Sequence, residues 1–100
     1  MKLKFMDWNC EVVLGKYNNG RTSIQLVASE DGEDICEGEP IATASVNIPT
    51  IPLASDEVMI KNYSENEGIL EALTQANIVK PTGKCVDTGF VSVPVCKLLI

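Results

Sequence analysis

The sequence predicts an α+β protein in which an antiparallel β-sheet of about five strands, arranged as a meander, carries one α-helix packed on one face. Three patterns lead to this fold class: a tight-turn sequence between two apolar segments, a segment of alternating apolar and polar residues, and apolar residues at helical spacing. The chain has 100 residues, of which 45% are hydrophobic and 22% are charged. That size and composition predict a single domain spanning residues 1–100.

The first half of the chain predicts a hairpin that begins a three-stranded meander. Apolar and aromatic residues dominate segments 3–8 and 10–17, and residues 17–21 read Tyr-Asn-Asn-Gly-Arg. Asn and Gly readily adopt the left-handed backbone that a tight turn requires. The following segment, 22–28, then places Ile24, Leu26 and Ala28 on one face, so this strand is expected to pair with the one before it.

The return strand of the meander is expected over residues 41–48. Ala42, Ala44, Val46 and Ile48 alternate there with polar residues, and a period of two predicts one buried and one solvent-facing side. Two prolines, at positions 49 and 52, then interrupt any ladder because proline has no N–H to donate.

One helix is expected in the second half, after a short strand at 58–60. Ser64 and Glu67 have the spacing of a capping box, in which each side chain bonds the other residue's backbone N–H. Apolar residues recur at positions 69, 70, 73 and 76 and form one helical stripe. The helix is predicted to end at Asn77, which tolerates a left-handed backbone.

A last strand or hairpin is expected over residues 85–99. Val91, Val93 and Val95 share one face of this segment. Pro94 cannot donate to a ladder, so its strand is predicted to lie at a sheet edge or to contain a bulge.

The net charge of −6 is concentrated in the middle of the chain. No Lys or Arg lies between Thr22 and Ile60, whereas this segment contains eight acidic residues. Six of them fall in a segment with two glycines, which is expected to be a mobile surface loop. These six candidate binding residues are Glu30, Asp31, Glu33, Asp34, Glu37 and Glu39.

Two interpretations of segment 30–39 stay open from the sequence. It is either a solvated connection that favours solubility or a contact surface for a partner protein with a basic surface. Direct binding of nucleic acid is not expected, because a phosphate backbone repels carboxylates. A calcium loop is not expected either, since Cys36 stands where the helix-loop-helix calcium motif needs its turn glycine.

The residue types argue against catalysis, a metal or a cofactor. The chain contains no His, which removes the usual acid/base group and the common nucleophile pairs, and it has no phosphate-binding glycine loop. Its four cysteines are widely spaced, unlike zinc ligands, and are expected to be reduced, partly buried thiols. Two weaker candidates are the carboxylate pair Asp56 and Glu57 and the Lys-flanked Cys85 and Cys96. The protein is therefore expected not to be an enzyme.

The chain carries no recognisable export or membrane signal. Asp7 interrupts the N-terminal segment before any apolar run of signal-peptide length, and prolines break the longest weakly charged stretch. A cytoplasmic protein without a membrane segment is expected.

Two parts of the chain carry a resemblance. Residues 17–21 together with 41–47, and residues 61–68, which read Lys-Asn-Tyr-Ser-Glu-Asn-Glu-Gly, resemble small uncharacterised proteins of bacterial mobile elements and phages. Small acidic proteins of that kind include inhibitors of host defence, such as anti-CRISPR proteins. The resemblance implies such a genomic setting and favours the contact-surface interpretation.

The leading hypothesis is a non-catalytic acidic protein that inhibits a nucleic-acid-binding defence protein by contact or by mimicry of nucleic acid. The alternative is a protein that sequesters a small ligand, such as a cyclic nucleotide, in a pocket between the helix start and the sheet. Trp8, Asn62 and Tyr63 are the candidate contacts of that pocket.

Overall fold

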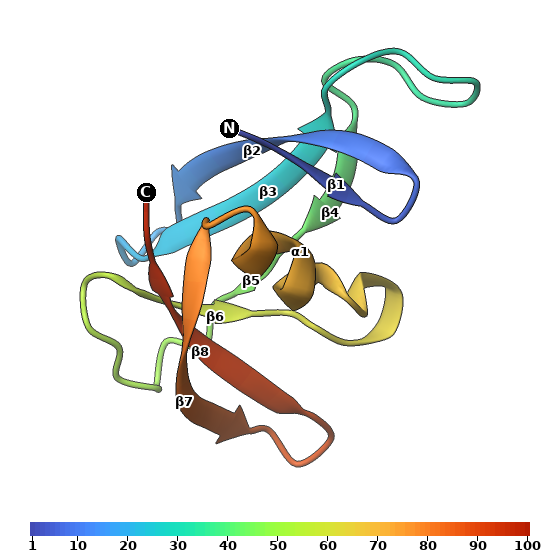
Figure 1. Cartoon of the computed structure of the whole chain (residues 1–100). Helices are drawn as coiled ribbons and strands as arrows, with labels where there is room; N and C mark the ends of the chain where they lie inside the picture. The colour runs from blue at the N-terminus through green and yellow to red at the C-terminus, as the bar shows by residue number, and fades with distance from the viewer.

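The computed structural model describes all residues 1–100 as eight strands and one α-helix, with a short 3-10 turn before the helix. The strands form two four-stranded antiparallel sheets, ordered β1-β2-β3-β4 and β5-β6-β8-β7 (Figure 1). The α+β class and the antiparallel pairing are confirmed. The expectation of about five strands in one sheet is wrong.

The elements have the following bounds. The first sheet contains β1 (Lys2–Phe5), β2 (Trp8–Lys16), β3 (Thr22–Ala28) and β4 (Pro40–Thr43). The second contains β5 (Ser45–Val46), β6 (Glu57–Ile60), β7 (Val79–Asp87) and β8 (Ser92–Leu98). The 3-10 turn covers Ser64–Asn66, and α1 covers Ile69–Gln75. No helix is long and apolar enough to cross a membrane.

The predicted β2–β3 hairpin is confirmed. Gly20, at φ 84°, donates its N–H to the Tyr17 carbonyl at 2.9 Å, and the Tyr17 N–H bonds the Arg21 carbonyl at 2.8 Å. Residues 24, 26 and 28 are all buried, as their alternation predicts. Segment 3–8, in contrast, is not one strand, because the chain reverses at Met6 (φ 55°) and Trp8 already belongs to β2.

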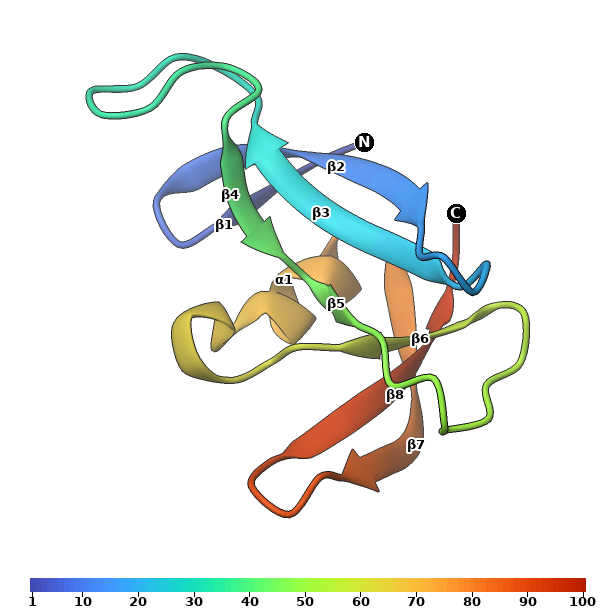
Figure 2. The same cartoon turned by 180° about the vertical axis from the view of Figure 1, so that it is seen from behind.

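The expected strand over 41–48 is split between the two sheets at Ala44 (Figure 2). Ala44 donates its N–H to the Ile24 carbonyl of β3 at 2.8 Å, while its own carbonyl accepts the Lys61 N–H at 2.8 Å. Ala44 and Ser45 are both buried, so the simple alternation fails here. Strands that change sheets in this way make the corners of two packed sheets.

The predicted capping box is wrong. Ser64 has a left-handed backbone (φ 54°) and belongs to the 3-10 turn, and no side chain caps that turn. The helix begins later, at Ile69, where the Asn62 Oδ1 accepts the Leu70 N–H at 3.0 Å. The helix ends at Gln75, two residues before the predicted end, and Asn77 has the predicted left-handed backbone (φ 59°).

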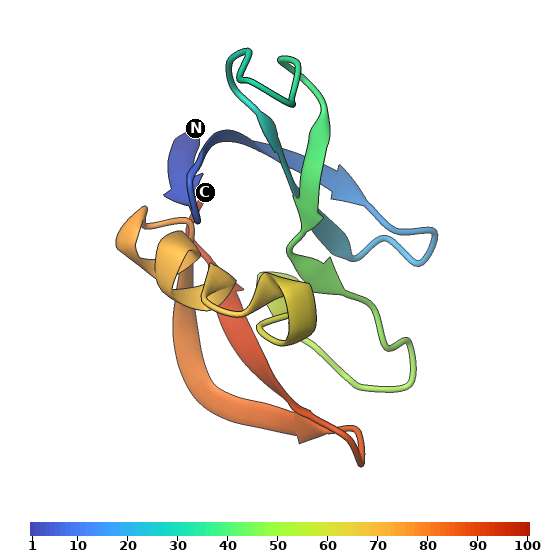
Figure 3. The same cartoon turned by 90° about the vertical axis from the view of Figure 1, so that its right-hand side faces the viewer.

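The helix closes the space between the two sheets rather than covering one face of a single sheet, as was expected. It packs against β1 and β7, the edge strands on that side of each sheet (Figure 3). On the other side the continuous β4–β5 passage joins the sheets. The main core lies between these walls and combines Phe5 and Leu26 of the first sheet with Ile60 of the second and Leu73 of the helix.

The C-terminal hairpin is longer than expected, because β7 begins at Val79. The strand that contains Pro94 is not an edge strand, since β8 lies between β6 and β7. Pro94 directly precedes Val95, which is the last β8 residue that pairs with β6. On its other side, the pairing of β8 with β7 is irregular between Pro81 and Cys85. The predicted edge position or bulge of the Pro94 strand is therefore wrong, and the irregularity belongs to β7, which has extra residues between Pro81 and Cys85.

Candidate functional site

The acidic loop, residues 30–39, projects from the ends of β3 and β4 beyond both sheets (Figures 1 and 2). Its base is fixed by backbone hydrogen bonds between Ala28 and Glu39 at 2.9 Å and between Gly38 and Ala28 at 2.8 Å. A further bond from the Gly32 N–H to the Ile35 carbonyl, at 2.8 Å, tightens its outer turn. The loop is exposed, as predicted, and follows a hydrogen-bonded course.

Most carboxylates of the acidic loop have no partner within the protein. Glu30 accepts a bond from the Asn9 amide at 2.5 Å, and Asp31 accepts the Glu37 N–H at 2.8 Å. All four ion pairs of the protein lie outside the loop. The exposed carboxylates without hydrogen bond or ion pair in the loop are those of Glu33, Asp34, Glu37 and Glu39.

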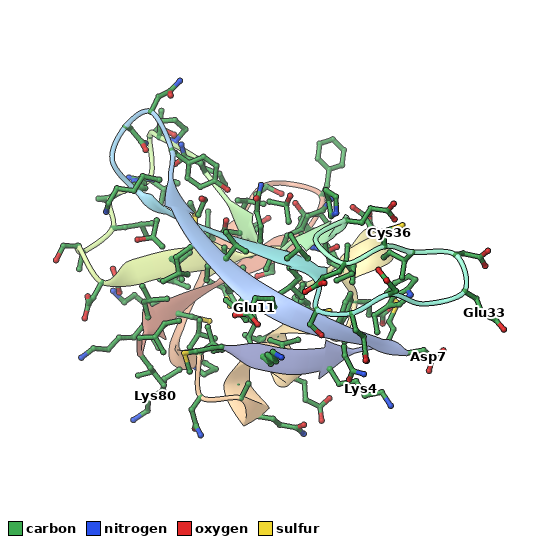
Figure 4. The ribbon with its side chains drawn as sticks, turned by 90° about the horizontal axis from the view of Figure 1, so that it is seen from above. Lys4, Asp7, Glu11, Glu33, Cys36 and Lys80 are labelled. Carbon is green, nitrogen blue, oxygen red and sulfur yellow. The ribbon has the colours of Figure 1, made fainter.

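A groove of about 450 Å³ lies between the acidic loop and the start of β2. Trp8 provides an aromatic wall and is 42% exposed, a large fraction for an indole. Aliphatic and polar groups complete the lining, namely Gly32, Ile35, Pro40 and Ile41 with the acids Glu33, Asp34 and Glu39. Glu33 lies at the outer end of the acidic loop, and its side chain points away from the strands (Figure 4). We call this site the Trp8 groove.

Two backbone features build the Trp8 groove. The β2–β3 register pairs Cys10 with Ala28, which sets Trp8 beside the first residues of the acidic loop. In the pairing of β3 with β4, Leu26 lies opposite Ala42 and the next residue, Val27, lies opposite Pro40. Ile41 therefore has no partner in β3 and forms a β-bulge. Bulges redirect side chains, and Ile41 contributes to the groove wall.

The Trp8 groove combines an indole face with three carboxylates, and this chemistry suits an organic cation. An arginine guanidinium is planar, stacks on aromatic faces and bonds carboxylates through two N–H groups at once. A lysine ammonium fits the charge but not the planar geometry. A phosphate would meet three negative groups and is disfavoured.

The structure does not bring the three small-ligand candidates together. Trp8 lines the Trp8 groove, whereas Asn62 and Tyr63 line none of the grooves. The Asn62 oxygen is engaged by the helix, and Tyr63 packs against the apolar cluster of Met59, Val93 and Val95. No sequence pattern indicates that Trp8 lies beside the acidic loop, because that proximity depends on strand register.

The weaker catalytic candidates are engaged in structural pairs. Lys84 bonds Glu57 at 3.0 Å, and Lys97 lies 3.6 Å from Asp56, so neither lysine is available to activate its neighbouring thiol. Burial, reinforced by the nearby Cys85, raises the pKa of Cys96 to about 11, which disfavours its thiolate. No group of three His, Cys, Asp or Glu is arranged to hold a metal ion.

Two smaller grooves, each of about 310 Å³, have mixed linings. One lies between the β1–β2 turn and α1 and contains Lys4, Glu67 and Glu71. The other borders β4 and contains the Lys61–Glu65 ion pair. Each of these two grooves contains both acidic and basic side chains, whereas the charged residues of the Trp8 groove are all acidic. The Trp8 groove is therefore the principal candidate site.

Comparison of the chain with protein-family models, with curated proteins and with solved structures finds no match.

Proposed function

We propose that this chain is a non-catalytic binding protein whose acidic loop and Trp8 groove engage a basic surface of a partner protein. The observation that carries the proposal is the Trp8 groove itself, where Glu33, Asp34 and Glu39 have no cationic partner beside an exposed indole. An arginine of the partner supplies both missing interactions.

The partner class follows from the charge distribution. A projecting loop with six acids in ten residues presents negative charge in a narrow space, as a nucleic-acid backbone does. Surfaces that bind nucleic acid are rich in Arg and Lys. The proposed partner is therefore a nucleic-acid-binding protein, and inhibition of a host defence effector by charge mimicry is the proposed role.

The chain offers its own probe for the test, because Trp8 is its only tryptophan. An arginine-rich peptide titrated into the protein at low salt is expected to change the Trp8 emission in a saturable way. A lysine-rich peptide of the same charge is expected to bind more weakly. Raising the salt concentration should weaken both complexes, since exposed charges are screened within about 8 Å at physiological ionic strength.

A pair of charge-matched variants makes the test specific. The double variant Glu33→Gln, Glu39→Gln removes two carboxylates of the Trp8 groove, and Glu67→Gln, Glu71→Gln removes two acids of the groove between the β1–β2 turn and α1. Both variants change the net charge from −6 to −4. Only the first is expected to lose binding; equal loss in both, or none in either, would contradict the proposal. Purified defence nucleases assayed with the same variants then test the inhibitory role.

The site geometry offers no observation that favours sequestration of a cyclic nucleotide. The largest groove is lined by three carboxylates, which repel phosphate. A thermal-shift screen against cyclic nucleotides tests this alternative directly, since a ligand of the native state must raise the unfolding midpoint.

A further inference from the structure

The Trp8 groove continues into the smaller groove that borders β4. The two grooves share Pro40 and Ile41 in their linings, and the smaller one extends along the strand to Thr43. Figure 2 shows the outer edge of β4 between the acidic loop and the segment that leads into α1. We call the two connected grooves the β4 channel.

The outer edge of β4 presents a free backbone donor to this channel. Only β3 pairs with β4, and the Ala44 N–H points towards β3, where it bonds the Ile24 carbonyl at 2.8 Å. Backbone groups of successive residues point to opposite sides of an antiparallel strand, so the N–H and the carbonyl of Thr43 point outward. The Asn66 side-chain amide donates to that carbonyl at 2.7 Å, which shows the same direction. The Thr43 N–H itself has no acceptor within the protein.

The far wall of the β4 channel is fixed and carries no unpaired positive charge. Asn66 is only 2% exposed and is held by its bond to the Thr43 carbonyl. The Lys61 ammonium is paired with Glu65 at 2.5 Å. All unpaired charge of the channel is therefore negative and lies at its Trp8 end.

We infer that the β4 channel binds an extended segment of the partner protein, in which one backbone carbonyl accepts the Thr43 N–H and an arginine two residues away enters the Trp8 groove. The arrangement rests on the proposed function and specifies the conformation of the bound segment. Addition of an extended peptide to an exposed sheet edge is a general mode of recognition. Two residues of a strand span about 7 Å, which is the separation along β4 between Thr43 and Ile41 of the Trp8 groove.

Charge favours a basic segment over a second copy of this chain at the same edge. The acidic loop lies at one end of the β4 channel and attracts positive groups, whereas a second copy brings another net charge of −6. In strand addition, backbone bonds contribute affinity and side-chain pockets contribute selectivity. An isolated arginine is expected to fill the Trp8 groove but to make none of the backbone contacts.

The test compares two probes on the full chain. One is the pentapeptide acetyl-Thr-Val-Arg-Val-Thr-amide, whose β-branched residues favour an extended backbone. The other is acetyl-arginine-amide, which fills only the Trp8 groove. The emission of Trp8 measures the affinity of both probes, and NMR measures hydrogen exchange of the Thr43 amide. Saturation with the pentapeptide is expected to slow this exchange, whereas saturation with acetyl-arginine-amide should leave it unchanged.

A pair of variants tests the backbone contact separately. Thr43→Pro removes the outward N–H and no bond of the β3–β4 ladder, a substitution that an edge strand tolerates. It should weaken pentapeptide binding about tenfold and leave the affinity for acetyl-arginine-amide unchanged. Thr43→Val keeps the N–H and should bind both probes as the unmodified chain does. The exchange measurement on the unmodified chain addresses the same contact without any substitution.

The outcomes separate this inference from the proposed function. If the pentapeptide binds without slowing exchange at Thr43, or binds Thr43→Pro as tightly as the unmodified chain, the β4 channel is not its site and the proposed function stands. Exchange at Thr43 that slows with protein concentration in the absence of peptide would show that a second copy covers the edge, which also overturns the inference. If neither probe changes the Trp8 emission, the proposed function fails and the inference fails with it.

Discussion

The hydroxyl of Ser45 accepts the backbone N–H of Ile24 at 2.9 Å, at the point where the chain leaves one sheet for the other. In a regular ladder that N–H would bond the Ala44 carbonyl, but this carbonyl accepts the Lys61 N–H instead. The Ser45 side chain thus replaces a missing backbone partner. It also bonds the Tyr17 hydroxyl at 2.8 Å, which ties the β2–β3 hairpin to the crossing strand.

Ser45→Ala is therefore expected to destabilise the fold by about 1–3 kcal/mol, because it leaves the buried Ile24 N–H without an acceptor. Urea unfolding measures the change in the free energy of unfolding. Ser55→Ala removes an exposed hydroxyl and should change it by less than about 0.5 kcal/mol. Equal effects of the two substitutions would show that the Ser45 bond is not a stabilising contact.

Asn62→Ala should destabilise the protein by about 1 kcal/mol, since the Leu70 N–H in the first turn of α1 loses its acceptor. Asn62→Asp keeps an oxygen in place and adds a negative charge near the helix start, so it should retain most of the stability. Thermal unfolding of the two variants checks this order. Equal destabilisation by Ala and Asp would contradict the capping role.

The Glu57 carboxylate is expected to make the stability of the protein depend on pH in the acid range. Its carboxylate accepts the Ala54 N–H at 2.8 Å and bonds Lys84, and these bonds lower its pKa below the ordinary value of 4.5. A lowered pKa in the folded state stabilises the protein above the unfolded-state pKa, and this stabilisation disappears as the pH falls through the folded-state value.

Glu57→Gln is expected to reduce stability at neutral pH and to flatten its decline below about pH 4.5. The measurement is the unfolding midpoint across the acid range. Glu67→Gln serves as the control, because its exposed carboxylate makes no ion pair. If the unfolding midpoint of Glu57→Gln falls with decreasing pH just as that of the unmodified chain does, the Glu57 carboxylate does not contribute to the pH dependence of stability.

The four thiols should react in two classes. Cys36 and Cys85 are exposed, whereas Cys10 and Cys96 are buried and burial raises the pKa of both. Alkylation at neutral pH, followed by mass spectrometry, should label two cysteines rapidly and the other two only after unfolding. Rapid labelling of Cys96 in the native protein would contradict this pattern.

Local patterns in the sequence predicted the β2–β3 hairpin, the apolar helix stripe and the left-handed Asn77. Each depends on residues within a few positions of one another, through turn preferences or side-chain periodicity. The capping box at Ser64 failed, because the Asn62 oxygen reaches the helix from outside it and the chain makes a 3-10 turn first.

The sequence by itself determined the α+β class, the exposed acidic loop and the concentration of negative charge in residues 30–39. Only the tertiary structure decided that the alternating segment 41–48 is shared by two sheets, because a period of two suits either sheet and the choice depends on distant partners of Ala44. The position of Trp8 beside the acidic loop follows in the same way from the pairing of Cys10 with Ala28. The loop's charge is thus a property of the chain, whereas its groove is a property of strand register.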